Sequence, residues 1–203
     1  VRVFIPKYTC MKQEMKDKLR YVTHFYMDFN WQNVDVGVLE AEEAGVHYYF
    51  IDNEQYFRRP GLYGYDDDNE RFAFFDFAVL ELLSHIDIKP DILHLHDWQT
   101  AMIATLYKER YAYYEYYQGI KIVFTIHNIA YQGKCDPALL SDHFGLDNYL
   151  YYNGNCRNDG CFNMMKAAIY YSDIITTVSP TYAKEILTDS FGEGLQNILQ
   201  MRR

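Results

Sequence analysis

Two polar segments of this chain could carry chemistry: one contains Asp97, and the other contains His127. Each directly follows a short apolar run, 91–95 before Asp97 and 121–126 before His127. A carboxylate and an imidazole can accept hydrogen bonds, hold charge or move a proton. The carboxyl ends of neighbouring parallel strands meet at one edge of a sheet, which is where open α/β proteins bind their ligands. We therefore expect the two segments to form one site.

The residues alone leave a second interpretation of each segment open. Asp97 also suits the N-cap of a helix that begins at the next residue. His127 could instead cap the end of its strand through hydrogen bonds. Asn128 and Tyr131 could bind hydroxyl groups of a ligand, but asparagine is also a common turn residue.

A metal site is a further possibility at the first segment, because His94 and His96 are two residues apart on one strand and therefore share a face with Asp97 close by. No other cluster of metal ligands accompanies them in the sequence. We therefore expect no metal, with His94 hydrogen-bonded in the core and His96 at the edge of the site.

The elements that position these residues follow from the hydrophobic pattern. Four runs are rich in β-branched and aliphatic residues: 1–5, 91–95, 121–126 and 173–178. Helical patterns separate these runs. That alternation predicts βαβ units and a mostly parallel sheet, and hence an α/β fold with flanking helices. Three further runs alternate between apolar and polar residues and predict an antiparallel hairpin or small meander: 24–29, 34–40 and 46–51.

Four helices are predicted between these strands. Asp67 can cap the first, with Glu70 at the capping-box position, and this helix must end before Pro90. The second and third are expected over 98 to about 110 and about 162 to 171. The fourth begins at Pro180, with Ser179 as its cap.

Composition limits the class of protein. The chain has 203 residues, of which 49% are hydrophobic, so it can bury one substantial core. A net charge of −9 gives no basic surface for nucleic acid and disfavours anionic membranes. No apolar run reaches the ~20 residues of a membrane helix, and the four cysteines lack paired CxxC spacing. We expect one cytoplasmic domain with free thiols.

Five tyrosines fall within residues 111–117, and they allow two interpretations. They could form a platform that stacks on sugar rings, or they could simply close a helix and form a surface connector. The connector is the simpler interpretation of the two.

Three segments, in this order, resemble the N-terminal catalytic domain of the bacterial glycogen synthase and starch synthase family: DILHLHDWQTAMIATLY, KIVFTIHNIAYQGKCDP and MMKAAIYYSDIITTVSPTYAKEI. The resemblance extends over essentially the whole chain. It implies a Rossmann-like domain, residues 1–203, that forms the N-terminal half of a two-domain GT-B glycosyltransferase. Family members also have a first strand with a glycine-rich loop and a C-terminal nucleotide-binding domain, so we expect this chain to be an internal piece of a longer enzyme.

The resemblance also implies roles for particular residues. The family histidine that matches His127 lies against the donor glucose, and the aspartate that matches Asp97 lies in the active-site cleft, so we predict both to be catalytic. The predicted substrate-binding residues are Tyr131, Asn128, Tyr65, Asp67 and His96. For Tyr65 and Asp67, which precede the first predicted helix, a local capping role is an equally good interpretation.

The function implied by the resemblance is transfer of glucose from ADP-glucose to the non-reducing end of an α-1,4-glucan with retention. Its partners would be the glucan and the nucleotide sugar, with neither a cofactor nor a metal. These residues alone are expected to be inactive, and they do not distinguish ADP-glucose from UDP-glucose. Two alternatives remain: a non-catalytic glucan-binding module, and a glycosyltransferase with a small acceptor.

Overall fold

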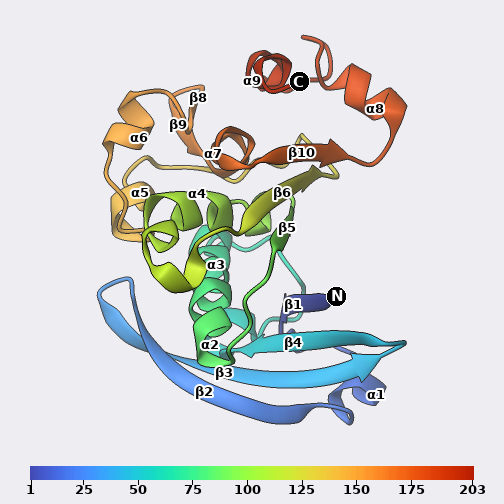
Figure 1. Cartoon of the computed structure of the whole chain (residues 1–203). Coiled ribbons are helices and arrows are strands. Elements are labelled where there is room, and N and C mark those ends of the chain that lie inside the picture. Colours follow the sequence, from blue (N-terminus) through green and yellow to red (C-terminus); the bar gives the residue numbers. More distant parts are fainter. The chain divides into compact units, whose positions relative to one another are not determined.

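The computed structural model describes all 203 residues, which form two compact units, residues 1–82 and 83–203 (Figure 1). The first unit contains one sheet with the strand order β1-β4-β3-β2. Its strands are β1 (Arg2–Pro6), β2 (Arg20–Phe29), β3 (Gln32–Glu43) and β4 (Val46–Asp52). β2, β3 and β4 form the predicted antiparallel meander, whereas β1 runs parallel to β4.

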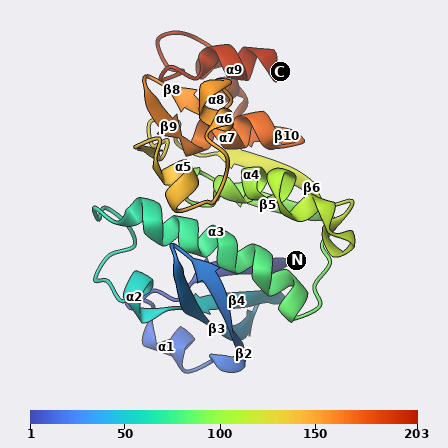
Figure 2. The same ribbon diagram turned by 90° about the vertical axis from the view of Figure 1, so that its left-hand side faces the viewer.

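The core of the first unit lies between this sheet and helix α3 (Asp68–His85). Phe25, Met27 and Phe29 alternate along β2 and are all buried. The ring of Phe29 meets the ring of Phe74 on α3 edge-on, with 5.9 Å between their centroids. Two short helices complete this unit, α1 (Gln13–Lys16) and α2 (Glu54–Phe57). Figure 2 shows α3 lying along the sheet.

The second unit is built on a parallel sheet with the order β10-β6-β5. Its strands are β5 (Ile92–His96), β6 (Lys121–Ile126) and β10 (Ile174–Thr177). Three of the four predicted parallel strands are therefore neighbours in one sheet. The first run, at residues 1–5, instead pairs in parallel with β4 in the other sheet.

The main helices of the second unit lie close to their predicted positions in the sequence. A 3₁₀ turn (Trp98–Thr100) leads into α4 (Met102–Glu109), and α7 (Met164–Tyr171) and α8 (Pro180–Glu185) begin within two residues of their expected starts. The Ser179 side chain accepts a hydrogen bond from the Tyr182 amide, which confirms the predicted cap. α4 and α7 contact each other, and α7 also contacts β6.

The remaining elements of the second unit are short. The helices are α5 (Leu139–Asp142), α6 (Tyr149–Tyr152) and α9 (Gln196–Met201). A small antiparallel sheet consists of β7 (Lys134–Cys135), β8 (Arg157–Asn158) and β9 (Cys161–Asn163). The tyrosine-rich connector forms two 3₁₀ turns (Tyr111–Tyr113 and Glu115–Tyr117). No helix is both long and apolar enough to cross a membrane.

Candidate functional site

The site in the second unit is assembled at the carboxyl ends of β5 and β6. His96 is opposite Thr125 in the parallel register. The ladder continues one residue further, because the Asp97 amide donates to the Thr125 carbonyl at 3.0 Å. This pairing brings the Asp97 segment beside the residues that follow β6, as the sequence predicted.

Asp97 uses its carboxylate to hold the neighbouring turn. Its Oδ1 accepts hydrogen bonds from the amide of His127 at 2.8 Å and from the amide of Asn128 at 3.3 Å. The 3₁₀ turn that begins at Trp98 receives no hydrogen bond from the Asp97 side chain. The alternative interpretation of Asp97 as an N-cap is therefore wrong, since its carboxylate binds two N–H donors at the adjacent strand exit instead.

The backbone of Asp97 is strained, with φ 56° and ψ −173°. Residues other than glycine avoid this region, and holding one there costs on the order of 1–3 kcal/mol. Such strain persists only where the surroundings impose it. Here the ladder bond on one side and the two amides held by the carboxylate supply that constraint.

Three histidine rings lie in a row along this edge. The rings of His94 and His96 are 4.3 Å apart, and those of His96 and His127 are 5.3 Å apart, measured between centroids. His96 Nδ1 and His127 Nε2 share a hydrogen bond of 3.0 Å. Partial desolvation and the two neighbouring imidazoles lower the pKa of His96. A neutral His96 can accept from His127, which fixes the ring of His127 and leaves its Nδ1 outside this bond.

A second chain of hydrogen bonds crosses the sheet below that row. His94 Nε2 and Thr125 Oγ1 are 2.6 Å apart, and Thr125 Oγ1 and Thr176 Oγ1 are also 2.6 Å apart. His94 is exposed and hydrogen-bonded, so its predicted place in the core is wrong while its predicted hydrogen bond is confirmed. Thr125 and Thr176 are supporting residues that the sequence analysis missed, since only the strand register brings them together.

The turn after His127 presents Asn128 and Tyr131. Asn128 Oδ1 accepts from the Ala130 amide at 3.0 Å, which is ordinary turn chemistry. Tyr131 is 65% exposed, so its hydroxyl is available to a ligand. The turn closes at Gly133, which has φ +64° and packs so tightly that a Cβ there would lie 2.7 Å from the Trp98 ring. This contact locks the turn against the residue that follows Asp97.

Two buried amides fix the end of the same turn and were also missed. Gln132 donates to the carbonyls of Ile129 and Glu193, each at 2.9 Å. Asn163 donates to Gln132 Oε1 at 2.6 Å, and its own Oδ1 caps α7 by accepting from the Lys166 amide. Asn163 stands directly before a helical pattern, so its capping role could have been read from the sequence, whereas its bond to Gln132 could not.

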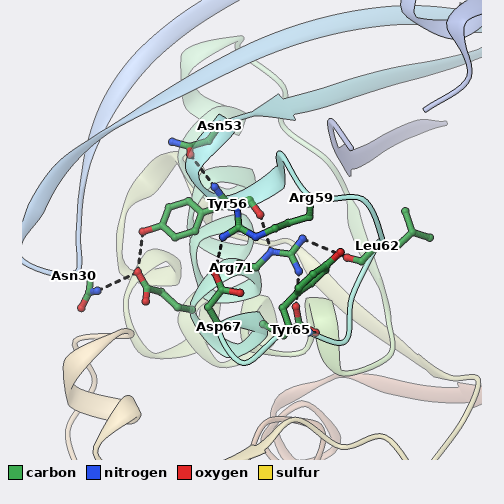
Figure 3. Close-up of polar contacts among 10 residues, drawn as sticks. Asn30, Asn53, Tyr56, Arg59, Leu62, Tyr65, Asp67 and Arg71 are labelled. Carbon is green, nitrogen blue, oxygen red and sulfur yellow. Dashed lines mark hydrogen bonds and ion pairs between the residues drawn. The ribbon is translucent and has the colours of Figure 1, made fainter. Parts of the chain in front are cut away.

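The two remaining predicted residues, Tyr65 and Asp67, lie in the first unit, where both have partners within their own loop (Figure 3). The Tyr65 hydroxyl accepts from the Gly61 amide at 2.7 Å, and Asp67 pairs with Arg59 at 2.8 Å. Glu70 accepts from the Tyr56 hydroxyl at 3.0 Å and from Asn30 at 3.2 Å. The carboxylates expected to cap α3 thus bind other groups.

Arg71 organises that loop from a fully buried position. It forms an ion pair with Asp68 and donates to the carbonyls of Tyr56 at 2.6 Å and Leu62 at 3.3 Å. Its guanidinium also lies over the Tyr65 ring, 5.0 Å from the centroid. A buried guanidinium needs this degree of pairing, because an unpaired buried charge is very unfavourable. The loop that carries Tyr65 and Asp67 is thus held to α3 and to the end of α2 by one buried side chain.

No group of three or more His, Cys, Asp or Glu side chains is arranged to hold a metal ion. The four cysteines are unpaired thiols. Burial raises the pKa of Cys135 and that of Cys156 to about 12, which makes both unreactive as nucleophiles at neutral pH. The chemistry available at the edge of the parallel sheet is therefore that of imidazole, carboxylate, amide and phenol groups.

Comparisons with known proteins agree in pointing to one family. The family model described as starch synthase catalytic domain matches residues 1–201. A glycogen synthase of Clostridium kluyveri is 48% identical over 202 residues, which are 100% of this chain and 42% of that protein. A glycogen synthase of Clostridium botulinum is 52% identical over 201 residues, again 42% of its length. The chain thus spans less than half of the curated relatives it matches.

A solved structure shares the fold. It is the catalytic domain of starch synthase IV from Arabidopsis thaliana bound to ADP and acarbose, which superimposes with a TM-score of 0.89 at 36% identity. The match covers 100% of this chain and 42% of that one. The Rossmann-like α/β fold of a GT-B catalytic domain, predicted above, is confirmed by this match.

Proposed function

Because the chain belongs to the starch synthase catalytic domain family, we propose that it forms the N-terminal catalytic part of a longer enzyme that extends α-1,4-glucans. The reaction would transfer glucose from ADP-glucose to the non-reducing end of the glucan with retention. The observation that carries this proposal is the hydrogen-bonded edge of the parallel sheet, where Asp97 holds the backbone of His127 and His96 holds its ring.

In this proposal His127 contacts the donor glucose. Its Nδ1 is not used in the bond to His96, so it can hydrogen-bond a sugar hydroxyl, and its main-chain position is set by Asp97. A single preorganised polar contact of this kind is often worth ~10²-fold to 10³-fold in rate. Asp97 acts mainly by positioning, since its Oδ1 is engaged by two amides.

Two further predicted residues of the second unit would bind substrate around this centre. Tyr131 and Asn128 extend from the turn that contains His127, and Tyr131 is the more accessible of the two for a ligand hydroxyl. For Tyr65 and Asp67 a role in substrate binding stays a prediction, alongside the loop contacts described above. A cytoplasmic location also stays a prediction.

The preference for ADP-glucose rests on the relatives. The matched Arabidopsis structure is bound to ADP and acarbose, which supports an adenine nucleotide as the leaving group and a glucan as the acceptor. The leaving diphosphate must be neutralised by cations. The edge described here offers none, so those cations are expected from the part of the longer enzyme that binds the nucleotide.

The test is transfer of labelled glucose to glycogen by the full-length protein, supplied with ADP-glucose or UDP-glucose, for the wild type and for His127→Ala. We expect transfer from ADP-glucose and a loss of ~10²-fold or more in the variant. Transfer that survives the substitution would overturn the role of His127. Glycogen binding without transfer from either donor would favour a binding module, and transfer to a sugar phosphate in place of glycogen would favour a small acceptor.

A further inference from the structure

The turn that follows β6 is held from two sides, and Asp97 supplies only one of them. Ile126 and Ile129 are buried, whereas the two residues between them, His127 and Asn128, are exposed. The backbone groups of the two isoleucines are buried with their side chains and therefore need hydrogen-bond partners. Asp97 does not provide these partners, since its carboxylate binds the amides of His127 and Asn128.

Thr177 provides a partner at the first end of this stretch. It is the last residue of β10 and lies opposite Ile126 in the parallel register. Its Oγ1 donates to the Ile126 carbonyl at 2.7 Å. The hydroxyl thus adds a side-chain bond to the strand pairing, directly before His127.

Tyr182 provides a partner at the second end. It lies in the first turn of α8, which follows β10 along the chain (Figure 1). Pro180 starts this helix, and Ser179 caps it by accepting from the Tyr182 amide at 3.0 Å. The Tyr182 hydroxyl accepts from the Ile129 amide at 2.9 Å. The capped start of α8 therefore determines where this hydroxyl lies.

Asp97, Thr177 and Tyr182 together hold four consecutive residues, 126–129. Each of the four has a backbone group that is bonded to a side chain from a neighbouring segment. His127 is one of them. A group that contacts a reacting substrate must be held within about 0.5 Å of its productive position, and supporting hydrogen bonds of this kind provide that precision.

We propose that Thr177 and Tyr182 are positioning residues for glucose transfer. They hold the His127 turn from the corner between β10 and α8, as Asp97 holds it from the end of β5. The proposal rests on the proposed function, because it concerns the contact of His127 with the donor glucose. Both residues act through His127 and need not touch the substrate themselves.

The competing explanation is that the two hydroxyls only stabilise the end of β10 and the start of α8. The two roles differ in what the loss of a hydroxyl changes. A purely stabilising bond changes the free energy of unfolding and leaves each folded molecule fully active. A positioning bond lowers the kcat of the folded enzyme, and it does so only while His127 is present.

The test measures kcat and the KM for ADP-glucose in the full-length enzyme at saturating glycogen, with urea unfolding beside them. Tyr182→Phe and Thr177→Val each remove one hydroxyl and keep the shape of the side chain, whereas Thr177→Ser keeps the hydroxyl. Tyr107→Phe is the matched control. The buried Tyr107 hydroxyl donates to the Tyr117 carbonyl at 3.0 Å, so it holds the connector between α4 and β6 and not the turn.

We expect Tyr182→Phe to lower kcat by about tenfold and Thr177→Val by about fivefold, with the KM within about twofold of wild type, because an unpaired backbone group lets the turn shift. Thr177→Ser should restore the kcat lost in Thr177→Val, and Tyr107→Phe should stay within about twofold of wild type. Added to His127→Ala, Tyr182→Phe should change the remaining rate by less than about twofold.

A wild-type kcat in both Tyr182→Phe and Thr177→Val would overturn the proposal, as would an equal loss in Tyr107→Phe. A further loss of full size in the His127→Ala background would also overturn it, because Tyr182 would then act on something other than His127. These outcomes leave the proposed function standing. No transfer by the wild type from either nucleotide sugar would overturn the proposed function, and this role with it.

Discussion

Asp97 combines an unfavourable backbone conformation with two hydrogen bonds that its side-chain oxygen accepts. These effects can be separated by two substitutions. Asp97→Ala loses the carboxylate and keeps the strain, whereas Asp97→Gly loses the carboxylate and removes the strain. We expect Asp97→Ala to be less stable than Asp97→Gly by about 1–2 kcal/mol in urea unfolding. Both should lose transfer activity, since the His127 turn is released in each.

Equal stability of the two variants would show that the backbone relaxes once the carboxylate is gone. Activity retained in Asp97→Gly would contradict the positioning role. Asp97→Asn is the useful companion, because its amide oxygen can still accept from the two backbone amides.

His96 gives the site a dependence on pH. Its pKa is lowered from an ordinary value of 6.5, so the unfolded chain takes up a proton at a higher pH than the folded protein does. Stability from this group is therefore present above about pH 6.5 and is lost as the pH falls toward the lowered pKa. We expect the melting temperature of the wild type to fall more steeply than that of His96→Gln between about pH 7 and 5.

His47→Gln is the control for that measurement, because it replaces another hydrogen-bonded histidine that lies outside the site. His47 pairs with Glu40 at 2.7 Å in the first unit. His47→Gln should leave the His96 contribution in place. Parallel pH profiles of the wild type and His96→Gln would contradict the prediction.

The proximity of Asp97 and His127 could be predicted from the sequence, but the contacts of the Asp97 carboxylate could not. Polar residues after two parallel strands predicted that Asp97 and His127 would meet. The capping hypothesis for Asp97 considered only the residues next to it. The two amides that its carboxylate binds are 30 and 31 residues further along the sequence. Only the strand register brings them nearer to this carboxylate than the amides of the following helical turn.

At the scale of elements, the turn from His127 to Gly133 is held by a close approach that permits no side chain. Gly133 and Gly154 both have positive φ values, +64° and +91°, but only Gly133 has atoms within reach of an added Cβ, the nearest being Trp98 Cε3 at 2.7 Å. Gly154→Ala should cost about 1–2 kcal/mol for its backbone alone. Gly133→Ala should cost roughly 1–3 kcal/mol more for the clash.

The measurement is chemical denaturation of both variants, with transfer assayed beside it. Gly133→Ala should also reduce transfer, because the clash displaces the segment that carries His127 and Tyr131. Equal destabilisation by the two alanines would mean that Trp98 moves aside without consequence.

Strand type was predictable, whereas the pairing partner of the first strand was not. The alternation in β2, β3 and β4 predicted the meander, and the runs rich in β-branched and aliphatic residues predicted β5, β6 and β10. β1 is also rich in such residues, yet it runs parallel to β4. Either parallel edge satisfies its backbone, and nothing within Arg2–Pro6 distinguishes between them.

At the scale of the whole molecule, the charge of −9 makes a prediction about the partner. A neutral glucan releases no counterions when it binds, in contrast to a nucleic acid. We expect glycogen affinity of the full-length enzyme to change by less than about twofold between roughly 50 and 300 mM NaCl. A steep fall with salt would indicate that binding depends on charged groups and would contradict this prediction.

The chain of hydroxyl and imidazole groups across the parallel sheet, His94 to Thr125 to Thr176, has a consequence for how this sequence can vary. Thr125 is the buried member of this chain, whereas His94 and Thr176 are exposed and can bond water when Thr125 is replaced. Loss of both exposed partners would instead leave the buried Thr125 hydroxyl unpaired, which is the costly case. Hybrids made by exchanging segments between relatives should therefore lose stability where they combine Thr125 with apolar residues at both of the other positions.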